Sequence, residues 1–318
     1  NYGVLAGLEV IRTLNEQGIQ TAAALEVVAW TNEEGARFVP VMMGSGVFTG
    51  AFSLDHALQA VDVDGLTVAG ELNKIGYAGK QLSGEVPGGM YDAYFEAHIE
   101  QGPILEAHDK PIGVVPGALG QRWFDVVVTG MEAHAGPTPM ELRHDAMLAT
   151  ARIVEEVNRI ALAHAPHARG TVGFAQVLPN SRNTIPGTVK FSVDFRALDD
   201  TVLLQMHKAL TAFCEQLSAR DPRLQIAVEQ VVYFPPCHFA ADCIDSVRAA
   251  AEALELPHME VVSGAGHDAV YLANVTPTAM IFVPCKDGIS HNEIEDAQPA
   301  HLAMGCDVLL NAVLRHAC

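Results

Sequence analysis

The sequence predicts an α/β protein, built on an open mixed sheet with helices on both faces and interrupted by an inserted α+β domain. The chain has 318 residues, more than a typical single domain holds. Three apolar runs of strand length each end in polar residues, as strands of open α/β sheets do where they form a site. Between the second and third runs the pattern changes to strand, helix, strand, strand, helix, strand.

The outer parts of the chain predict one helix and three buried strands. Apolar residues recur at helical spacing over Val4–Leu14, and Gly18 is suited to cap the C-terminus of this helix. The runs Leu25–Trp30, Tyr94–Ile99 and Thr278–Val283 are rich in apolar residues, which is typical of strands in a parallel sheet. Each run is followed by side chains able to bind a metal or a substrate.

The middle of the chain predicts a compact domain of its own. The expected elements are strands at Trp123–Gly130, Thr171–Leu178, Thr188–Arg196 and Leu224–Phe234, a helix opened by the capping box Thr138-Pro-Met-Glu141 and ending near His164, and a helix capped by Asp199 or Asp200 and ending near Arg220. Their order is the split ferredoxin-like motif. We therefore expect a main domain formed by residues 1–118 and 234–318, with a lid or dimerisation domain inserted at residues 119–233.

The composition excludes several classes of partner. Lys and Arg total 19 against 38 Asp and Glu, which gives a formal charge of −19 and a surface that repels nucleic acid and anionic lipid. No apolar run approaches the roughly 20 residues that a membrane span needs. The six cysteines form no Cys-x-x-Cys pair, so we expect free thiols and a cytoplasmic protein.

The strand Thr188–Arg196 alternates between apolar and polar side chains, which predicts a half-exposed antiparallel strand. Arg196 lies on its polar face, and a guanidinium is a natural bidentate partner for a carboxylate. A protein this acidic needs such a local positive group to hold an anionic substrate. The alternative is an ion pair between Arg196 and Asp194 or a neighbouring strand.

Three strand ends carry residues that suit a catalytic metal site. Glu33 and Glu34 follow the first run, where one carboxylate can bind a metal while the other acts as general base; a solvated acidic turn is the alternative. His98 lies in the second run, where a satisfied core histidine is the usual explanation, and His291 follows the third in a loop that equally suits a surface residue. Together Glu34, His98 and His291 form the mixed nitrogen and oxygen set that suits zinc.

A series of short motifs runs along nearly the whole chain. They are Thr31-Asn-Glu-Glu-Gly-Ala-Arg-Phe38, Gly44-Ser45, His98-Ile-Glu-Gln-Gly102, His134-Ala-Gly-Pro-Thr-Pro-Met140, Arg143-x-Asp145-Ala, Asn183-Thr-Ile-Pro-Gly187, Asp194-Phe-Arg196, Gly264-Ala-Gly-His-Asp-Ala269 and Ser290-His-Asn-Glu293. In this order they resemble the amidase, hydantoinase/carbamoylase family, a branch of the zinc aminoacylase and carboxypeptidase superfamily. His98 is the most specific feature, because the related peptidases have an acidic ligand there.

The resemblance implies a role for each candidate residue. Glu33 would be the general base, Glu34 and His291 would bind one metal ion, and His98 would bind the other. His134 would stabilise the oxyanion and reach the neighbouring subunit's site across a dimer. Substrate contacts are implied for Gln101, His134, Asn183, Arg196 and the backbone of Gly266.

The resemblance also implies two divalent metal ions, zinc first, with manganese, cobalt and nickel as alternatives. The family supplies a His-x-Asp segment and a bridging Asp before the first helix, and this sequence begins just after that point, so two ligands are absent from it. A homodimer through the inserted domain is implied. The other partner is a small anionic ureido substrate, with neither nucleic acid nor membrane.

The activity that these features predict is hydrolysis of the carbamoyl carbon–nitrogen bond of N-carbamoyl-L-amino acids. Allantoate amidohydrolase is the first alternative, because the shape of a pocket is not readable from sequence. An aminoacylase or peptidase, a thiol amidase built on Cys285 and a non-catalytic binding protein are the others.

Overall fold

Residues 1–79 and 90–318 are described by the computed structural model, and they fall into two compact units. The first unit comprises Asn1–Ala118 and His238–Cys318, and the second comprises Leu119–Cys237. The sequence places the second boundary after residue 233, whereas the second unit continues to Cys237. Its last long strand ends at Phe234, so the observed boundary lies in the connection that follows this strand.

The first unit contains most of the helices of the described chain. In chain order its elements are α1 (Tyr2–Gln17), α2 (Met43–Phe48), α3 (Leu54–Gln59), α4 (Val68–Lys74), β1 (Tyr94–Ile99), α5 (Ile104–Ala107), β2 (Ile112–Val115), β3 (Gly117–Ala118), β11 (Cys237–His238, which spans the boundary), α8 (Ala241–Ala253), β12 (His258–Glu260), α9 (Asp268–Leu272), β13 (Thr278–Val283), η2 (Lys286–Gly288) and α10 (Pro299–Ala317).

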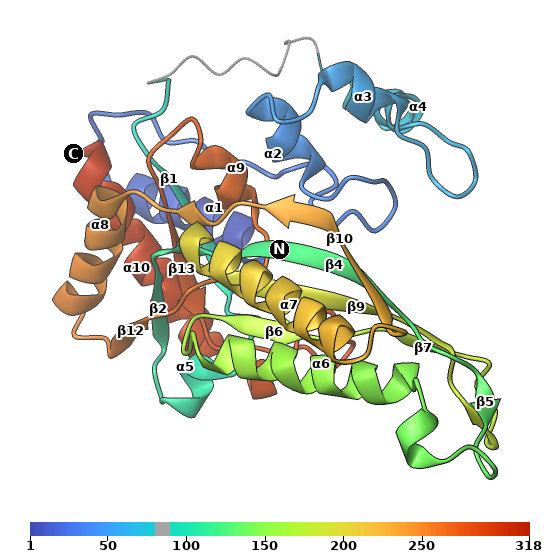
Figure 1. Cartoon of the computed structure of the whole chain (residues 1–318). Coiled ribbons are helices and arrows are strands. Elements are labelled where there is room, and N and C mark those ends of the chain that lie inside the picture. The colour runs from blue at the N-terminus through green and yellow to red at the C-terminus, as the bar shows by residue number, and fades with distance from the viewer. Residues whose placement is uncertain (80–89) are drawn as a thin grey trace. The chain divides into compact units, whose positions relative to one another are not determined.

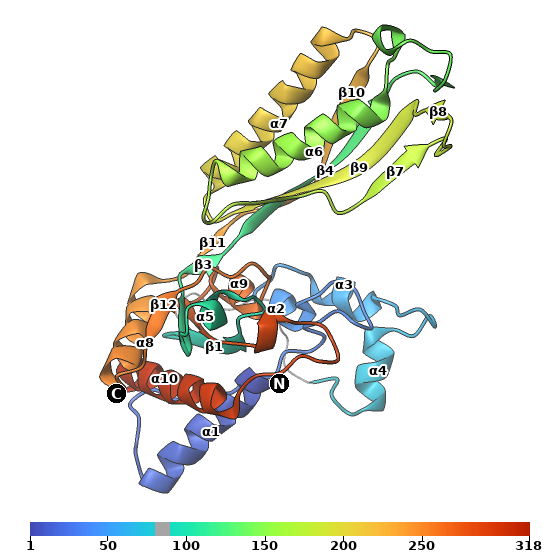
Figure 2. The ribbon, with the colours of Figure 1, turned by 90° about the horizontal axis from the view of Figure 1, so that it is seen from below.

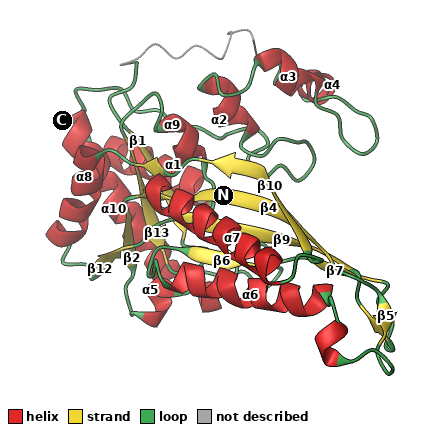
Figure 3. Cartoon of the chain, viewed as in Figure 1, coloured by secondary structure: helices red, strands yellow, loops and turns green. Residues whose placement is uncertain are grey.

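A mixed sheet forms the centre of the first unit, and in the described residues it has four strands in the order β1-β13-β2-β12. β1 runs parallel to β13 and β2 parallel to β12, whereas β13 and β2 are antiparallel. All six residues of β13 are buried, as expected of a central strand covered on both faces. The predicted strands Tyr94–Ile99 and Thr278–Val283 are confirmed, and so is the α/β class with a mixed sheet (Figure 3).

The two faces of this sheet have different coverings. On one face, α1, α8 and α10 pack against Ala97, Ile281 and their apolar neighbours. Because side chains alternate along a strand, Glu96 and His98 project from the other face. There α9 contacts β1 and β13, and the amide of Ala269 donates to the Glu96 carboxylate. The sheet is therefore covered by helices on both sides, with ionisable side chains on the α9 side.

The first predicted helix is confirmed with its cap. α1 ends at Gln17, and Gly18 adopts the left-handed conformation with φ of 64° while its amide donates to the carbonyl of Asn15. α1 buries Ala6, Val10 and Leu14, which lie at helical spacing on one face.

The prediction that Leu25–Trp30 is a buried strand was wrong. This segment has no ladder partner in the described residues, and its side chains are half-buried or exposed rather than buried. Val27 packs on α1, where a Cβ at Gly7 would lie 3.1 Å from its methyl groups, and Trp30 Nε1 donates to Tyr94 Oη at 3.2 Å. An apolar run indicates that a segment packs against the core. It does not indicate whether a neighbouring strand is present to form the ladder hydrogen bonds of a sheet.

The second unit is an antiparallel sheet with two long helices on one face (Figures 1 and 2). β9 lies at its centre, between β4 on one side and both β6 and β7 on the other, and β10 extends the sheet beyond β4. Phe124, Phe191, Phe195 and Leu210 belong to its buried core. The elements are β4 (Gly120–Thr129), β5 (Ala133–His134), η1 (Met140–Leu142), α6 (Ala146–Leu162), β6 (Arg169–Thr171), β7 (Ala175–Leu178), β8 (Thr184–Ile185), β9 (Thr188–Ala197), α7 (Asp200–Arg220) and β10 (Gln225–Phe234).

Two expectations for this unit need correction, and one is confirmed. The predicted strand Thr171–Leu178 is two strands, because residues 172–174 leave the ladder between β6 and β7. The Thr138 capping box does not start the helix: α6 begins after Asp145, whose carboxylate accepts from the amides of Met147 and Leu148. The residues between Thr138 and Asp145 include the short 3-10 helix η1 and do not continue into α6, which the capping-box motif alone does not reveal. The Asp199 cap of α7 is confirmed.

Candidate active site

Glu33 and Glu34 lie on a well-braced loop between Trp30 and α2. Asn32 has a left-handed backbone with φ of 52°, and its side chain donates to the carbonyls of Phe38 and Pro40 at 2.8 and 3.1 Å. The carbonyl of Glu33 accepts from the amide of Met42 at 2.7 Å. These contacts close the loop on itself and hold the backbone that carries both carboxylates.

A glycine lets α2 approach this loop closely. A Cβ on Gly44 would lie 2.7 Å from the amide nitrogen of Thr31, and the amide of Gly44 donates to the Thr31 carbonyl at 2.9 Å. Any side chain at this position would push α2 and the Glu33–Glu34 loop apart. The Gly44-Ser45 motif is thus explained by packing rather than by chemistry at the glycine.

The structure brings Glu34, Gln101 and His291 together from three distant segments. Glu34 Oε2 lies 3.4 Å from His291 Nε2, and both side chains are about two-thirds exposed, at 66% and 68%. Gln101 Nε2 donates to Ser290 Oγ at 2.9 Å and lies 3.5 Å from His291 Nε2. A carboxylate, an amide and an imidazole therefore meet at one accessible point.

His98 projects from β1 with one ring nitrogen committed to the backbone. Its Nδ1 donates to the carbonyl of Ile99 at 2.8 Å, which leaves the lone pair on Nε2. Burial lowers the pKa of His98, so the ring is neutral, as a metal ligand requires. The imidazole contacts the His267 ring at a centroid separation of 4.8 Å. His98 is thus neither a solvent-exposed histidine nor an apolar core residue with both nitrogens satisfied.

Glu33 has the properties of a proton acceptor. Its carboxylate is half-buried, and burial together with the adjacent Glu34 charge raises its pKa, while His291 opposes the shift. A carboxylate with a raised pKa is a stronger base than an ordinary glutamate. Glu34, by contrast, is exposed and pairs with His291. The two adjacent carboxylates therefore occupy different environments, as different roles would need.

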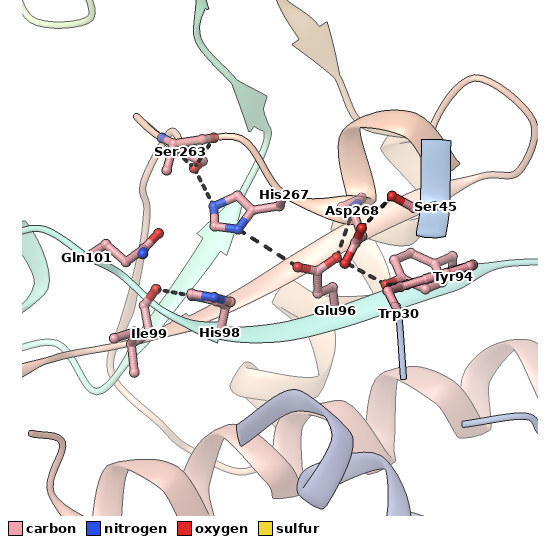
Figure 4. Close-up of polar contacts among 12 residues, drawn as sticks. Trp30, Ser45, Tyr94, Glu96, His98, Ile99, Gln101, Ser263, His267 and Asp268 are labelled. Atoms are coloured by element: carbon pink, nitrogen blue, oxygen red, sulfur yellow. Dashed lines mark hydrogen bonds and ion pairs between the residues drawn. The ribbon is translucent and has the colours of Figure 1, made fainter. Parts of the chain in front are cut away.

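A buried polar network lies next to His98, whose ring contacts that of the network residue His267 (Figure 4). Glu96 Oε2 accepts from Tyr94 Oη at 3.1 Å and from the Ala269 amide at 2.9 Å, while Ser45 Oγ donates to Asp268 Oδ1. His267 Nε2 bonds Ser263 Oγ at 2.8 Å, and its Nδ1 faces Glu96 Oε1 at 3.8 Å. This network connects β1, α2 and the loop before α9.

Burial sets the charge state of the network. It raises the pKa of Glu96 to about 8 and that of Asp268 to about 7. The Asp268 charge adds to the Glu96 shift, and the Glu33 charge adds to both. Burial also lowers the pKa of His267 to about 3, so this ring is neutral. Sequence reasoning missed these residues, although Ser45, His267 and Asp268 lie within recognised motifs. The available signal was Glu96, a carboxylate in an otherwise apolar strand two residues before His98.

Gly266 lies in the turn between Ser263 and α9. A Cβ at this position would meet the Met42 methyl at 3.1 Å, so a larger residue would press on the start of α2. The network residue Ser263 holds this turn, since its Oγ accepts from the Ala265 amide at 3.1 Å. The turn is therefore coupled to the Glu33–Glu34 loop through α2.

The remaining candidates lie in the second unit. His134 on β5 pairs with Thr184 on β8, and the Ala135 amide donates to the Asn183 carbonyl at 2.8 Å, so His134 and Asn183 belong to adjoining loops. Arg196 on β9 forks onto Asp194, with Nη2 at 2.8 Å and Nε at 3.1 Å from Oδ2. The ion pair weighed as an alternative for Arg196 is thus present, and it lies on the predicted polar face of the strand.

Membership of a family follows from comparison with known proteins. A model of the peptidase family M20/M25/M40 matches residues 1–315. An amidase of the hydantoinase/carbamoylase family from Burkholderia multivorans has a TM-score of 0.95 at 56% identity, covering 100% of this chain and 76% of its own. The chain belongs to the M20/M25/M40 peptidase family, and the resemblance to hydantoinase/carbamoylase amidases is confirmed.

Two relatives are named for hydrolysis of ureido compounds. The N-carbamoyl-L-amino-acid amidohydrolase of Rhizobium meliloti is 47% identical over 319 residues, which cover 99% of this chain and 75% of the relative. The allantoate amidohydrolase of Bacillus subtilis is 32% identical over 318 residues, covering 99% and 76%. No helix among the described residues is long and apolar enough to cross a membrane.

Proposed function

We propose that this protein hydrolyses the carbamoyl carbon–nitrogen bond of N-carbamoyl-L-amino acids, yielding the amino acid, ammonia and carbon dioxide. The observation that carries the proposal is the meeting of Glu34 and His291 beside Glu33, a half-buried carboxylate with a raised pKa. The similarity to a relative of this activity at 47% identity supports the same substrate class.

The donor set fits part of a divalent metal centre. Glu34 and His291 offer one oxygen and one nitrogen within 3.4 Å of each other, and the His98 Nε2 lone pair is available. Residues 1–79 and 90–318 contain no group of three or more His, Cys, Asp and Glu side chains that could hold a metal ion. As the family resemblance implies, Glu34 with His291 would contribute to one site and His98 to a second. A bound divalent ion would polarise the carbamoyl oxygen and make a water molecule more acidic.

The proton transfers would belong to Glu33. Its carboxylate would take a proton from the attacking water and then deliver it to the leaving nitrogen, which converts a poor leaving group into an amine. Positioned acid–base catalysis of this kind contributes about 100- to 10,000-fold in rate. Gln101, held beside His291 by Ser290, would orient the ureido group from the same side.

The second unit would supply the carboxylate clamp and an oxyanion donor. Arg196 would bind the substrate carboxylate with its guanidinium fork. His134 would donate a hydrogen bond to the carbamoyl oxygen as negative charge develops there, a contribution worth about 100- to 1,000-fold for one such donor. Asn183, on the loop adjoining His134, would bind the substrate beside it.

A homodimer would allow both Arg196 and His134 to act on a substrate. The Asn183 loop leads into β9 at Thr188, the first residue of that strand. Arg196 lies eight positions further along the same strand (196 − 188), which is roughly 26 Å at about 3.3 Å per residue. A small ureido acid is much shorter than this distance, so one second unit would not hold it with both Arg196 and His134. We therefore propose that His134 and Asn183 act in the partner subunit's site.

A direct assay distinguishes between the candidate ureido substrates. Purified protein loaded with zinc, manganese, cobalt or nickel is assayed for ammonia release from a panel of N-carbamoyl-L-amino acids and from allantoate. We expect kcat/KM to be highest for an N-carbamoyl-L-amino acid. Preference for allantoate, which the 32% identical relative supports as the alternative, would replace the proposed substrate. A thiol amidase is disfavoured because burial raises the pKa of Cys285 and so opposes formation of its thiolate.

A further inference from the structure

The loop that carries His134 is held by an arginine to which the proposed reaction gives no role. Arg143 Nη2 donates to the carbonyl of Ala135 at 2.7 Å, and its Nε donates to the carbonyl of Thr138 at 3.1 Å. The side chain is half-buried. One guanidinium therefore joins two carbonyls three residues apart, which closes the loop from 134 to 138 around it.

An amide of the same loop bonds one ring nitrogen of His134. The amide of Gly136 donates to His134 Nδ1 at 3.1 Å, so Nδ1 is an acceptor and the neutral ring holds its hydrogen on Nε2. The Gly136 amide belongs to the peptide group whose carbonyl is that of Ala135, the same carbonyl that Arg143 holds. Fixing this peptide plane also fixes the direction of the Gly136 N–H.

Arg143 extends from a rigid base. The next residue, His144, is buried, and its Nδ1 lies 2.5 Å from Asp221 Oδ2 at the end of α7. The His144 carbonyl accepts from the Met131 amide at 2.9 Å. Asp145 then caps α6. The backbone at Arg143 is thus anchored to two helices and to the segment after β4, so its guanidinium can impose a geometry on the loop.

We propose that Arg143 is a positioning residue, which holds the 134–138 loop so that the Gly136 amide fixes His134 in the tautomer with hydrogen on Nε2. This inference deepens the proposed function, because an oxyanion needs a hydrogen-bond donor and a neutral histidine offers one only at its protonated nitrogen. Lysine at position 143 would keep the charge but not the fork that joins both carbonyls.

The first test is spectroscopic and does not depend on activity. Full-length protein labelled with 15N-histidine is examined by long-range 1H–15N NMR above pH 8, where an ordinary histidine is neutral. The His134 signals are assigned by their loss in His134→Gln. We expect wild-type His134 to show one protonated Nε2 and one unprotonated Nδ1, and Arg143→Lys and Arg143→Met to show an averaged pair. An unchanged His134 pattern in both variants would overturn the proposal.

The second test separates positioning from folding. Arg152→Met is the matched control, because Arg152 is an exposed arginine on α6 of the same unit. On the best ureido substrate we expect Arg143→Met to lower kcat by about 100-fold, as a misplacement near 1 Å does, with KM changed less than about threefold. Arg143→Lys should recover part of that loss. Equal falls in kcat for Arg143→Met and Arg152→Met, or a fall that follows only the melting temperature, would contradict the proposal.

The two hypotheses fail in different ways. If no ureido substrate is hydrolysed, the proposed function fails while the NMR pattern still decides the role of Arg143. If hydrolysis is found but the His134 tautomer is the same with and without Arg143, the positioning role fails alone.

Discussion

Glu34 Oε2 and His291 Nε2 lie 3.4 Å apart, although 257 positions (291 − 34) separate the two residues in the chain. Both side chains are largely exposed. The two side chains are brought close by the braced loop that holds Glu34 and by Gln101, which contacts His291. A carboxylate facing an imidazole in this way is suited to share a cation.

The first prediction concerns metal content. His291→Ala and Glu34→Gln should each lower the divalent metal bound per chain, because each removes one ligand of the proposed site. His98→Ala should lower the metal bound at the second proposed site, to which His98 contributes. Metal content after dialysis, measured by elemental analysis, is the readout, and exposed His167→Ala is the control. Metal content equal to wild type in all three variants would show that the ligands lie elsewhere.

The second prediction separates the base from the ligands. Glu33→Gln keeps the size of the side chain but cannot accept a proton, so kcat should fall about 100- to 10,000-fold with the metal content unchanged. Exposed Glu155→Gln should have no effect. If Glu33→Gln loses metal together with activity, Glu33 is a ligand rather than the base.

The third prediction concerns the substrate clamp. Arg196→Lys should lower kcat/KM about 10- to 100-fold, since one charge-assisted hydrogen bond is worth about 1.5–3 kcal/mol and lysine cannot reproduce the fork. The loss should disappear with a substituted urea that lacks the carboxylate. A loss of equal size on both compounds would indicate that Arg196 acts structurally, through its ion pair with Asp194.

The fourth prediction tests the shared site. Inactive His134→Ala and inactive Glu33→Gln proteins are mixed under conditions that exchange subunits. If His134 acts in the partner's site, each mixed dimer contains one intact composite site, and activity should return to a fraction of wild type. Heterodimers verified by differential tags that stay as inactive as their parents would confine His134 to its own chain.

The fifth prediction is the pH dependence of stability. Folded Glu96 and Asp268 have pKa values of about 8 and about 7, above their ordinary values of 4.5 and 3.8. Folded His267, with a pKa of about 3, has the opposite effect below the ordinary histidine pKa of 6.5. Above that value the folded state still retains carboxyl protons that the unfolded chain has released, so the free energy of unfolding should fall as pH rises from about 6.5 to about 8. Urea unfolding of metal-free protein measures it. Asp268→Asn should flatten the decline, and an unchanged slope would mean that this carboxyl is not protonated in the folded protein.

The sequence by itself determined those features whose cause is local. Gly18 ends α1 because few other residues adopt its backbone conformation, Asp199 caps α7, and the alternation of Thr188–Arg196 sets one face of β9 into the core. The motifs likewise identified Glu33, Glu34, Gln101 and His291 as candidates, and the structure brings them into one neighbourhood.

Only the tertiary structure decided the relationships between distant segments. Leu25–Trp30 has the composition of a strand, yet its hydrogen bonds depend on a neighbour that composition does not reveal. The burial of Glu96 beside Asp268 follows from the packing of α9 on β1 and of α2 on α9, and no spacing in the sequence encodes it. The same holds for the contacts of Arg143, which donates to two backbone carbonyls. Every residue has a backbone carbonyl, so the residue types in the sequence do not indicate which carbonyls an arginine will bind.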